Sequence, residues 1–421
     1  MARSGTMMAA NGRRVLAILL LAYIFNFLDR QIVSILAEPI KKDLGLSDGQ
    51  LGLMGGLAFA LFYTGLGIPI AWLADRKSRV TIISVSLALW SGFTALCGFA
   101  GNFWQLFLAR MGVGIGEAGG VAPSYALISD SFPPHQRGRA LAIFSFGIPI
   151  GSALGIFFGG WIASHIDWRA AFIIVGLAGL ILAPLVKFGV PEAPRGALDG
   201  VRIEDAASLA EVGRTLSHKL SFWLLSFGSA CSSVIGYGFA FWLPSFLARS
   251  HGLDLIDRSL FYGAIALVGG LAGVWMGGWL GDRAGASDPG GYARIPAFCF
   301  LLAVPLYAVG LFAPSLAVAF VLLLIPTALS LAWLGPGIAA IQQVVPPHMR
   351  ATASAIFLFV NNLIGIGFGT WFLGFMSDRM MAAYGEDSLR HSMLYGLVFY
   401  LAAATLYLIA ARRLSSDWHR S

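Results

Sequence analysis

The sequence predicts an all-α polytopic membrane protein in which twelve transmembrane helices form two six-helix bundles related by pseudo-two-fold symmetry. Three observations support this fold class: the composition, the number of apolar segments and an internal repeat. Of the 421 residues, 57% are hydrophobic and 12% are charged, at a mean hydropathy of +0.77. A soluble domain carries roughly 25% charged residues, so this chain has about half the charge that a water-facing surface needs.

The apolar segments come in two groups of six. A spanning helix needs about 20 apolar residues, and segments of about this length are separated by Gly, Pro or charged residues. They lie at about 14–38, 50–74, 80–100, 103–129, 138–164 and 169–190, and then at about 220–248, 258–281, 293–313, 316–342, 350–376 and 391–411. The predicted domains are therefore an amino-terminal bundle (1–190), a linker (191–218) and a carboxy-terminal bundle (219–421).

Two stretches of the first half recur in the second half. Residues 133–144 (PPHQRGRALAIF) match residues 346–357 (PPHMRATASAIF), at an offset of 213 residues. Asp75-Arg76, after the second segment, matches Asp282-Arg283, after the eighth, at an offset of 207 residues. Parallel six-helix repeats are typical of carriers that rock around a site at the bilayer midplane.

The linker is predicted to contain a short amphipathic helix on the membrane surface. Leu209, Val212 and Leu216 recur at helical spacing in the stretch DAASLAEVGRTLSHKL. A disordered linker is the alternative.

The net charge of +7 reflects topology. Lys and Arg are concentrated in the even-numbered connections and at the two ends of the chain, whereas the odd-numbered connections are poorer in them. By the positive-inside rule, both termini are expected to face the cytoplasm. The sequence therefore predicts a lipid bilayer as the surrounding medium and no nucleic-acid partner.

The stretch GVGIGEAGG at 112–120 matches the G-x-G-x-x-G pattern of dinucleotide-binding loops. That pattern has this meaning only between a strand and a helix, whereas here it lies inside the fourth apolar segment. We expect this segment to be one continuous helix from Asn102 to Ile128. Gly112 and Gly116 then form a G-x-x-x-G pair, which allows a neighbouring helix to approach closely.

Three charged residues are predicted to lie near the bilayer midplane. Asp29 is in the first segment, and Arg110 and Glu117 are two turns apart in the fourth. A charge at this depth costs several kcal/mol unless it is paired, hydrated or neutralised. One arginine between two acids can stabilise the ionised form of only one of them, so the other acid is suited to carry a proton. Asp29 and Glu117 are the predicted proton-coupling residues, and a purely structural ion-pair cluster is the alternative.

The second half supplies no charge at the equivalent depth. Its seventh, tenth and eleventh segments offer aromatic and neutral polar residues, and such a wall suits the apolar body of an anion whose head group lies on Arg110. The predicted substrate-binding residues are Tyr23, Asn26, Arg110, Tyr237, Trp242, Ser330, Asn361 and Asn362. For any single aromatic residue of this set, packing or lipid contact is the alternative.

The two Asp-Arg loops are predicted to form conformational latches. Asp75 is expected to accept hydrogen bonds from a helix amino terminus of the other half, where the helix dipole favours an anion. Asp130 is expected to pair with Arg79. The predicted latch residues are Asp75, Arg76, Arg79, Asp130, Asp282 and Arg283. Exposed ion pairs are worth under ~1 kcal/mol, so a latch requires partial burial.

An intramembrane enzyme is not expected, because the seven histidines lie at or near loops and chain ends. The three cysteines lie in apolar runs without metal-ligand spacing, so no metal site is predicted. A channel would need rings of repeated polar residues, whereas the charges lie in one half only. These observations favour a carrier without a cofactor.

Several of these motifs resemble a known family. The stretches Asp75-Arg-Lys-Ser-Arg79 and Gly278-Trp-Leu-Gly-Asp-Arg-Ala-Gly285 resemble the loop signature of the major facilitator superfamily, with Ala71 and Ser78 where glycine is usual. The stretch DWRAAF at 167–172 is similar to another recurrent segment of that superfamily. Within it, the stretches YIFNFLDR (23–30), RMGVGIGEA (110–118) and IPIGSALG (148–155) look like the Spinster-type transporters. The resemblance is strong over 20–180 and only architectural in the second half.

This resemblance implies a proton-coupled secondary transporter that moves a lysophospholipid or sphingoid phosphate by rocker-switch alternating access. Asp29, Glu117 and Arg110 match the central residues of the family. A related group of anion:proton carriers begins with a similar Asn-x-x-Asp-Arg run, so a small organic anion is the alternative substrate. The resemblance also implies a monomer in a bacterial-type inner membrane, with protons and a small amphipathic anion as its partners.

Overall fold

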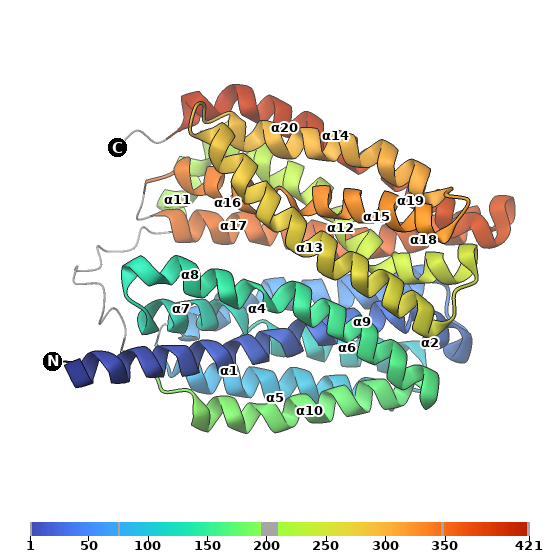
Figure 1. Ribbon diagram of the computed structural model, residues 1–421, viewed down its shortest axis with the longest axis horizontal. Helices are drawn as coiled ribbons and strands as arrows, with labels where there is room; N and C mark the ends of the chain where they lie inside the picture. Colours follow the sequence, from blue (N-terminus) through green and yellow to red (C-terminus); the bar gives the residue numbers. More distant parts are fainter. Residues whose placement is uncertain (1, 75, 195–208, 347–348, 419–421) are drawn as a thin grey trace. The chain divides into compact units, whose positions relative to one another are not determined.

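The computed structural model describes residues 2–74, 76–194, 209–346 and 349–418. These residues are almost entirely helical, and no strand occurs among them (Figure 1). The predicted all-α class is therefore confirmed.

The chain divides into two compact units that exchange short segments. Unit 1 comprises Met1–Leu46, Leu53–Ile203 and Asp254–Gly263, and unit 2 comprises Ser47–Gly52, Glu204–Leu253 and Ala264–Ser421. The first half of the sequence thus contributes Ser47–Gly52 to unit 2, and the second half contributes Asp254–Gly263 to unit 1. The domains predicted from the sequence (1–190, 191–218 and 219–421) are contiguous and do not include these two exchanged segments.

Unit 1 is built on long apolar helices. Its helices are α1 (Ala2–Ile35), α2 (Ala37–Leu44), α4 (Ala58–Ala74), α5 (Arg79–Cys97), α6 (Phe103–Glu117), α7 (Val121–Ser131), α8 (Pro134–Ser145), α9 (Gly147–His165) and α10 (Trp168–Gly189), with a π-helical turn, η1, at Leu53–Leu57. Helix α1 packs along α9, and α5 packs along both α6 and α10. Figure 1 shows α5 and α10 running side by side.

Glycines allow the closest of these approaches. A Cβ atom added at Gly116 of α6 would lie 2.4 Å from the backbone nitrogen of Trp90 in α5. A Cβ atom added at Gly112 would lie 2.3 Å from the Phe93 ring, also in α5. Both glycines therefore serve the close helix packing that the sequence predicted.

The expectation of one continuous helix from Asn102 to Ile128 is wrong. Helix α6 ends at Glu117 and α7 begins at Val121. Between them the backbone forms hydrogen bonds between residues three apart, as in a 3₁₀-helix, instead of four apart. For example, the Gly120 N–H group donates to the Glu117 carbonyl at 3.0 Å. Helix packing is close at this break, since a Cβ added at Gly119 would lie 2.1 Å from Ser86 Oγ of α5. Glu117 is thus the last residue of its helix.

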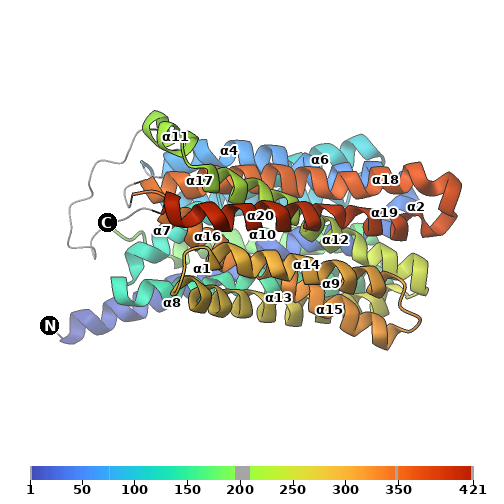
Figure 2. The ribbon, with the colours of Figure 1, turned by 90° about the horizontal axis from the view of Figure 1, so that it is seen from above.

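Unit 2 has a corresponding set of helices. They are α3 (Asp48–Gly52), α11 (Leu209–Ser217), α12 (Leu220–His251), α13 (Leu255–Gly285, which begins in unit 1), α14 (Gly291–Leu311), α15 (Leu316–Leu331), α16 (Leu334–Gln343), α17 (Arg350–Asn362), α18 (Gly369–Tyr384), α19 (Ser388–Gly396) and α20 (Val398–Asp417), with η3 (Leu363–Phe368) and η4 (Gly385–Asp387) between them. Helix α20 packs along α12 and α14, and Figure 2 shows α14 beside α20.

Ten helices or helix runs among the described residues are long and apolar enough to cross a membrane. Two causes account for the difference from the twelve predicted segments. The run Thr352–Asp417 contains the last two segments. The fourth segment is divided into α6, with 15 residues, and α7, with 11, and each is too short to be counted alone.

The predicted linker helix is present as α11, but its environment differs from the expected membrane surface. Val212 and Leu216 have no exposed surface. Helix α11 packs against α12 and α17, and Trp223 Nε1 donates to the Leu216 carbonyl at 3.0 Å. These two residues of its apolar stripe are therefore covered by the protein rather than exposed at a membrane surface.

Candidate functional site

The three charges predicted near the midplane lie together in the interior of unit 1. Asp29 on α1 is 1% exposed, Arg110 on α6 is 2% exposed and Glu117 at the end of α6 has no exposed surface. In their ionised forms Asp29 and Glu117 would repel each other, and the Arg110 guanidinium would attract both carboxylates. The three residues therefore form one electrostatic cluster, built from two helices.

The pairing within this cluster differs from the expected one. Arg30 Nε donates to Glu117 Oε2 at 2.6 Å, so Arg30 is the ion-pair partner of Glu117. Thr94 Oγ1 on α5 donates to Asp29 Oδ2 at 2.7 Å. The expectation that Arg110 lies between the two acids as their common partner is therefore not met. Among the described residues, the Nε and Nη1 atoms of Arg110 have no hydrogen-bond partner.

Aromatic rings hold Arg30 in place. Its guanidinium carbon lies 4.6 Å from the centre of the Tyr63 ring, 4.7 Å from Phe59 and 5.0 Å from Phe27. Rings at these distances attract a cation through their quadrupoles. Sequence reasoning missed this role of Arg30, although the residue directly follows Asp29. It also missed Thr94, because a single hydroxyl in an apolar segment carries no recognisable pattern.

This arrangement is suited to binding both protons and an anion. A buried charged donor without a partner carries a desolvation penalty of at least about 1–3 kcal/mol, which an anion at Arg110 would remove. Glu117 Oε1 and Asp29 Oδ1 also have no hydrogen-bond partner among the described residues. Both acids therefore have an oxygen that can take up a proton.

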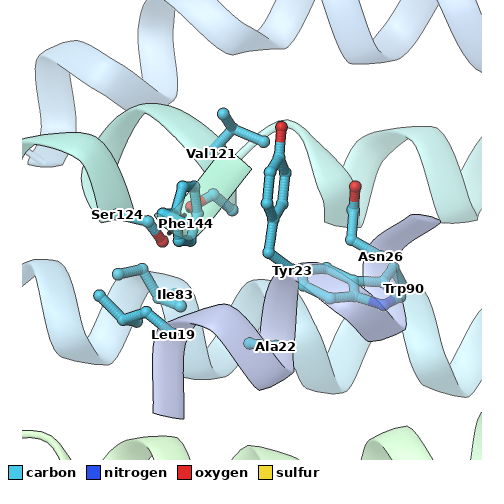
Figure 3. Close-up of a pocket in the computed structure, with 10 residues that line it drawn as sticks. Leu19, Ala22, Tyr23, Asn26, Ile83, Trp90, Val121, Ser124 and Phe144 are labelled. Atoms are coloured by element: carbon cyan, nitrogen blue, oxygen red, sulfur yellow. Dashed lines mark hydrogen bonds between the residues drawn. The ribbon is translucent and has the colours of Figure 1, made fainter. Parts of the chain in front are cut away.

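Tyr23 and Asn26 line a small cavity beside this cluster (Figure 3). The Tyr23 ring stacks on Phe144 of α8, with ring centres 4.3 Å apart. The cavity has about 10 Å³ of room for the centre of a water molecule, whereas ligand pockets generally measure hundreds of Å³. In this structure Tyr23 and Asn26 thus border a space too small for a lipid or an organic anion.

The predicted substrate-binding residues of the second half lie in unit 2 and differ in burial. Trp242 has no exposed surface, and its Nε1 donates to the Thr370 carbonyl at 2.8 Å, which favours a packing role. Asn361 is buried and accepts a hydrogen bond from Ser233 Oγ at 2.8 Å. Ser330 is 7% exposed, whereas Tyr237 and Asn362 are half-buried.

A second buried ion pair lies in unit 2, and sequence reasoning did not predict it. Arg249 at the end of α12 donates to both carboxylate oxygens of Asp48, each at 2.7 Å, and Ser377 Oγ also donates to Asp48 at 2.7 Å. The Asp378 carboxylate accepts the backbone N–H groups of Asp48 and Gly49 at 2.9 and 2.7 Å. This cluster attaches the exchanged segment Ser47–Gly52 to unit 2.

The first predicted latch contains the expected Arg79–Asp130 ion pair. Arg79 is 3% exposed, and its Nε also donates to Glu192 at 3.0 Å. Sequence reasoning missed Glu192, which accepts from Ser78 Oγ and from two backbone N–H groups at the start of α5. The cluster therefore has the partial burial that a latch requires.

The other predicted latch residues lie differently. Arg76 is exposed, with its guanidinium 3.9 Å from the centre of the Trp72 ring. Asp282 and Arg283 are exposed, so the second loop lacks the burial expected of a latch. Asp75 lies outside the described residues.

Replacing Glu192 by glutamine tests its role at the start of α5. Partial burial raises the pKa of Glu192, but hydrogen bonds from Ser78, Val80 and Arg79 outweigh this effect and hold the pKa below the usual 4.5. The stabilisation is therefore complete above pH 4.5 and is lost as the pH falls through the lower folded-state pKa. We expect Glu192→Gln to cost about 0.5–1 kcal/mol at pH 7, because helix caps are worth this much when partly exposed.

The measurement is the thermal midpoint of the detergent-solubilised protein between pH 7 and pH 3.5. The gap between wild type and Glu192→Gln should close at acidic pH, and Glu386→Gln, at an exposed position in η4, is the matched control. A gap that persists unchanged at pH 3.5 would show that the charge of Glu192 is not responsible.

No group of three or more His, Cys, Asp or Glu side chains in the described part of the chain could hold a metal ion.

Comparison with known proteins gives consistent matches. Residues 19–370 match the family model of the Major Facilitator Superfamily. The chain is 34% identical to an "MFS-type efflux pump" of Mycolicibacterium smegmatis over 95% of this chain and 92% of that protein. It is 30% identical to "Protein spinster homolog 1" of Xenopus laevis over 87% of this chain and 74% of that protein.

A solved structure agrees with these matches. It is a bacterial homologue of the human lysosomal transporter Spinster, in an inward-facing and unoccupied conformation. It aligns with a TM-score of 0.89 and 33% identity, over 97% of this chain and 99% of the other.

Proposed function

Because the chain belongs to the Major Facilitator Superfamily and is of the Spinster type, we propose that this transporter is a proton-coupled carrier of an amphipathic anionic lipid, such as a lysophospholipid or a sphingoid phosphate. Asp29 and Glu117 bind and release the protons, and Arg110 binds the anionic head group. The carrier works by rocker-switch alternating access.

The burial of Arg110 without a partner for its Nε and Nη1 atoms is the observation that carries this proposal. A guanidinium presents donors in a fork that matches a phosphate or a carboxylate. An anion bound there competes with Asp29 and Glu117 for the same positive charge. Substrate binding and protonation of the acids are thereby linked, which is the requirement for coupled transport.

A small organic anion is the alternative substrate, because Arg110 would bind its carboxylate in the same way. The two substrates differ in their apolar part. A lipid has a large apolar body, which must contact aromatic or aliphatic side chains, whereas a small organic anion does not. Tyr237 of unit 2 remains a candidate for this contact, since it is aromatic and keeps exposed surface.

The test is the internal pH of proteoliposomes that contain a trapped pH dye. Wild type, Asp29→Asn and Glu117→Gln are compared with a lysophospholipid, a sphingoid phosphate and small organic anions, and Glu386→Gln is the control for an exposed carboxylate. We expect a substrate-triggered pH change in wild type and in the control that is abolished in the other two variants. Labelled substrate that crosses the wild-type membrane without any pH change would refute proton coupling. The protein would then still be a carrier, but one that moves its substrate without protons.

We further propose that the protein is a monomer in a bacterial-type inner membrane, with both termini in the cytoplasm. The placement of Lys and Arg in the sequence supports this orientation. The cluster of Arg79, Asp130 and Glu192 then lies on the cytoplasmic side, where it acts as a latch. A cysteine introduced at Ser415, which is exposed, in a variant whose three natural cysteines are replaced by alanine would test the orientation. Its reaction with a membrane-impermeant reagent in intact cells would contradict a cytoplasmic carboxy terminus.

A further inference from the structure

The small cavity in unit 1 has the size and lining of a site for one water molecule. It lies between α1, α5, α7 and α8, and its 10 Å³ of room for a water centre is about the space that one buried water requires. Most of its lining is apolar, and its polar side chains are Tyr23, Asn26, Trp90 and Ser124. Ser124 is already engaged, because its Oγ donates to the Gly120 carbonyl at 2.7 Å.

Two of these polar side chains are almost fully buried and lack a hydrogen bond of good geometry. Trp90 and Asn26 are each 2% exposed. The Trp90 Nε1–H group and both polar atoms of the Asn26 amide have no hydrogen-bond partner among the described residues. Figure 3 shows both side chains at the cavity. Leaving such a buried group unsatisfied costs about 1–3 kcal/mol, so a polar molecule that bridges them is strongly favoured.

The Asn26 side chain connects this cavity to Glu117. Its amide lies close enough to the Glu117 carboxylate to interact with it electrostatically, although no hydrogen bond of good geometry joins the two side chains. An amide has one acceptor oxygen and one donor nitrogen, so its orientation decides which of them faces the carboxylate. Only the orientation with Nδ2 toward Glu117 stabilises an ionised carboxylate.

We propose that the cavity binds one water molecule and that this water fixes the orientation of Asn26. Trp90 Nε1–H is a donor only, so the water accepts its hydrogen bond and donates its own to Asn26 Oδ1. Asn26 Nδ2 is then directed toward Glu117. Trp90 and Asn26 are thus positioning residues that stabilise the ionised form of Glu117 at a depth where charge is otherwise costly.

The significance of this water for transport rests on the proposed role of Glu117 as a proton carrier, whereas its binding does not. Charge-assisted hydrogen bonds are among the stronger ones in proteins. Loss of the Asn26 donor should reduce the ratio of ionised to protonated Glu117 by about tenfold at a fixed pH. Trp90→Phe produces this loss while keeping an aromatic ring in the same place.

The experiment combines a high-resolution structure with infrared spectroscopy of wild type and Trp90→Phe. We expect density for a water molecule at hydrogen-bonding distance from Trp90 Nε1 in wild type and none in the variant. The carboxylic-acid C=O band of Glu117, identified by its absence in Glu117→Gln, should grow in Trp90→Phe. Trp104→Phe, at a position that is 67% exposed on α6, should change neither result.

Absence of the water in wild type, or an unchanged Glu117 band in Trp90→Phe, would overturn the proposal. Should Trp90→Phe prove too unstable to purify, Asn26→Leu gives the same comparison, because it removes the bridge at its other end. Both readouts are independent of transport. If wild type moved substrate without a pH change, the proposed coupling would fail while the density and the band would still decide the water site.

Discussion

Replacing Arg30 by glutamine is expected to lower the free energy of unfolding by about 3–5 kcal/mol, which is the usual cost of removing one partner of a buried ion pair. Glu117 has no exposed surface and would lose its hydrogen bond from Arg30 Nε at 2.6 Å. The substitution would also remove the contacts of the Arg30 guanidinium with three aromatic rings. Because the Arg30 side chain is 14% exposed, we expect the lower part of this range.

The measurement is equilibrium unfolding of the purified protein in mixed micelles. Arg169→Gln is the matched control, because Arg169 pairs with Asp43 at the same distance of 2.6 Å while the two side chains are 33% and 45% exposed. Such a pair should contribute under about 1 kcal/mol. The double variant Arg30→Gln/Glu117→Gln should recover most of the loss, since it leaves no uncompensated charge. Equal effects of Arg30→Gln and Arg169→Gln would refute the importance of the buried pair.

Gly116→Ala is expected to destabilise the protein by about 1–3 kcal/mol or more, the usual cost of overpacking a core. The added Cβ would lie 2.4 Å from the backbone nitrogen of Trp90 and 2.8 Å from its Cα atom. Backbone atoms of a packed helix move only if α5 and α6 separate. This separation would also displace Glu117, the next residue, so the proton-linked transport proposed above should fall together with stability.

Gly92→Ala is the control for this substitution. Gly92 lies in α5, and an added Cβ there would meet no atom within 4 Å. Alanine is favoured over glycine in a helix by about 1 kcal/mol, so Gly92→Ala should be neutral or stabilising. Thermal midpoints of both variants measure the difference. Equal midpoints for Gly116→Ala and Gly92→Ala would show that α5 and α6 are free to separate.

Much of the fold could be predicted from the sequence because hydropathy acts locally. A bilayer requires every spanning backbone to satisfy its own hydrogen bonds, so each long apolar run must be helical. The break between Glu117 and Val121 could not be predicted in this way. The break coincides with the close approach of Gly119 to Ser86 of α5, and apolar periodicity contains no information about such an approach.

For the candidate site too, the charged residues could be predicted from the sequence, whereas their contacts could not. Asp29, Arg110 and Glu117 were recognisable because charged residues in apolar segments are costly and therefore few. Their pairing was not recognisable, because Arg30 reaches Glu117 across 87 positions of the chain and Thr94 reaches Asp29 across 65. Asp48 and Glu192 were missed because they lie at segment ends, where acidic residues are common and carry no distinctive signal.

The sequence by itself determined the helical class, the repeat of six apolar segments and the presence of buried acids beside a buried arginine. Each of these follows from the cost of exposing polar groups to lipid, which depends on residue type and on position along one segment. Only the tertiary structure decided which cation pairs with Glu117, where α6 ends and which side chains surround the cavity at Trp90. These features depend on distances between helices, and those distances are set where glycines of one helix allow the backbone of the next to approach.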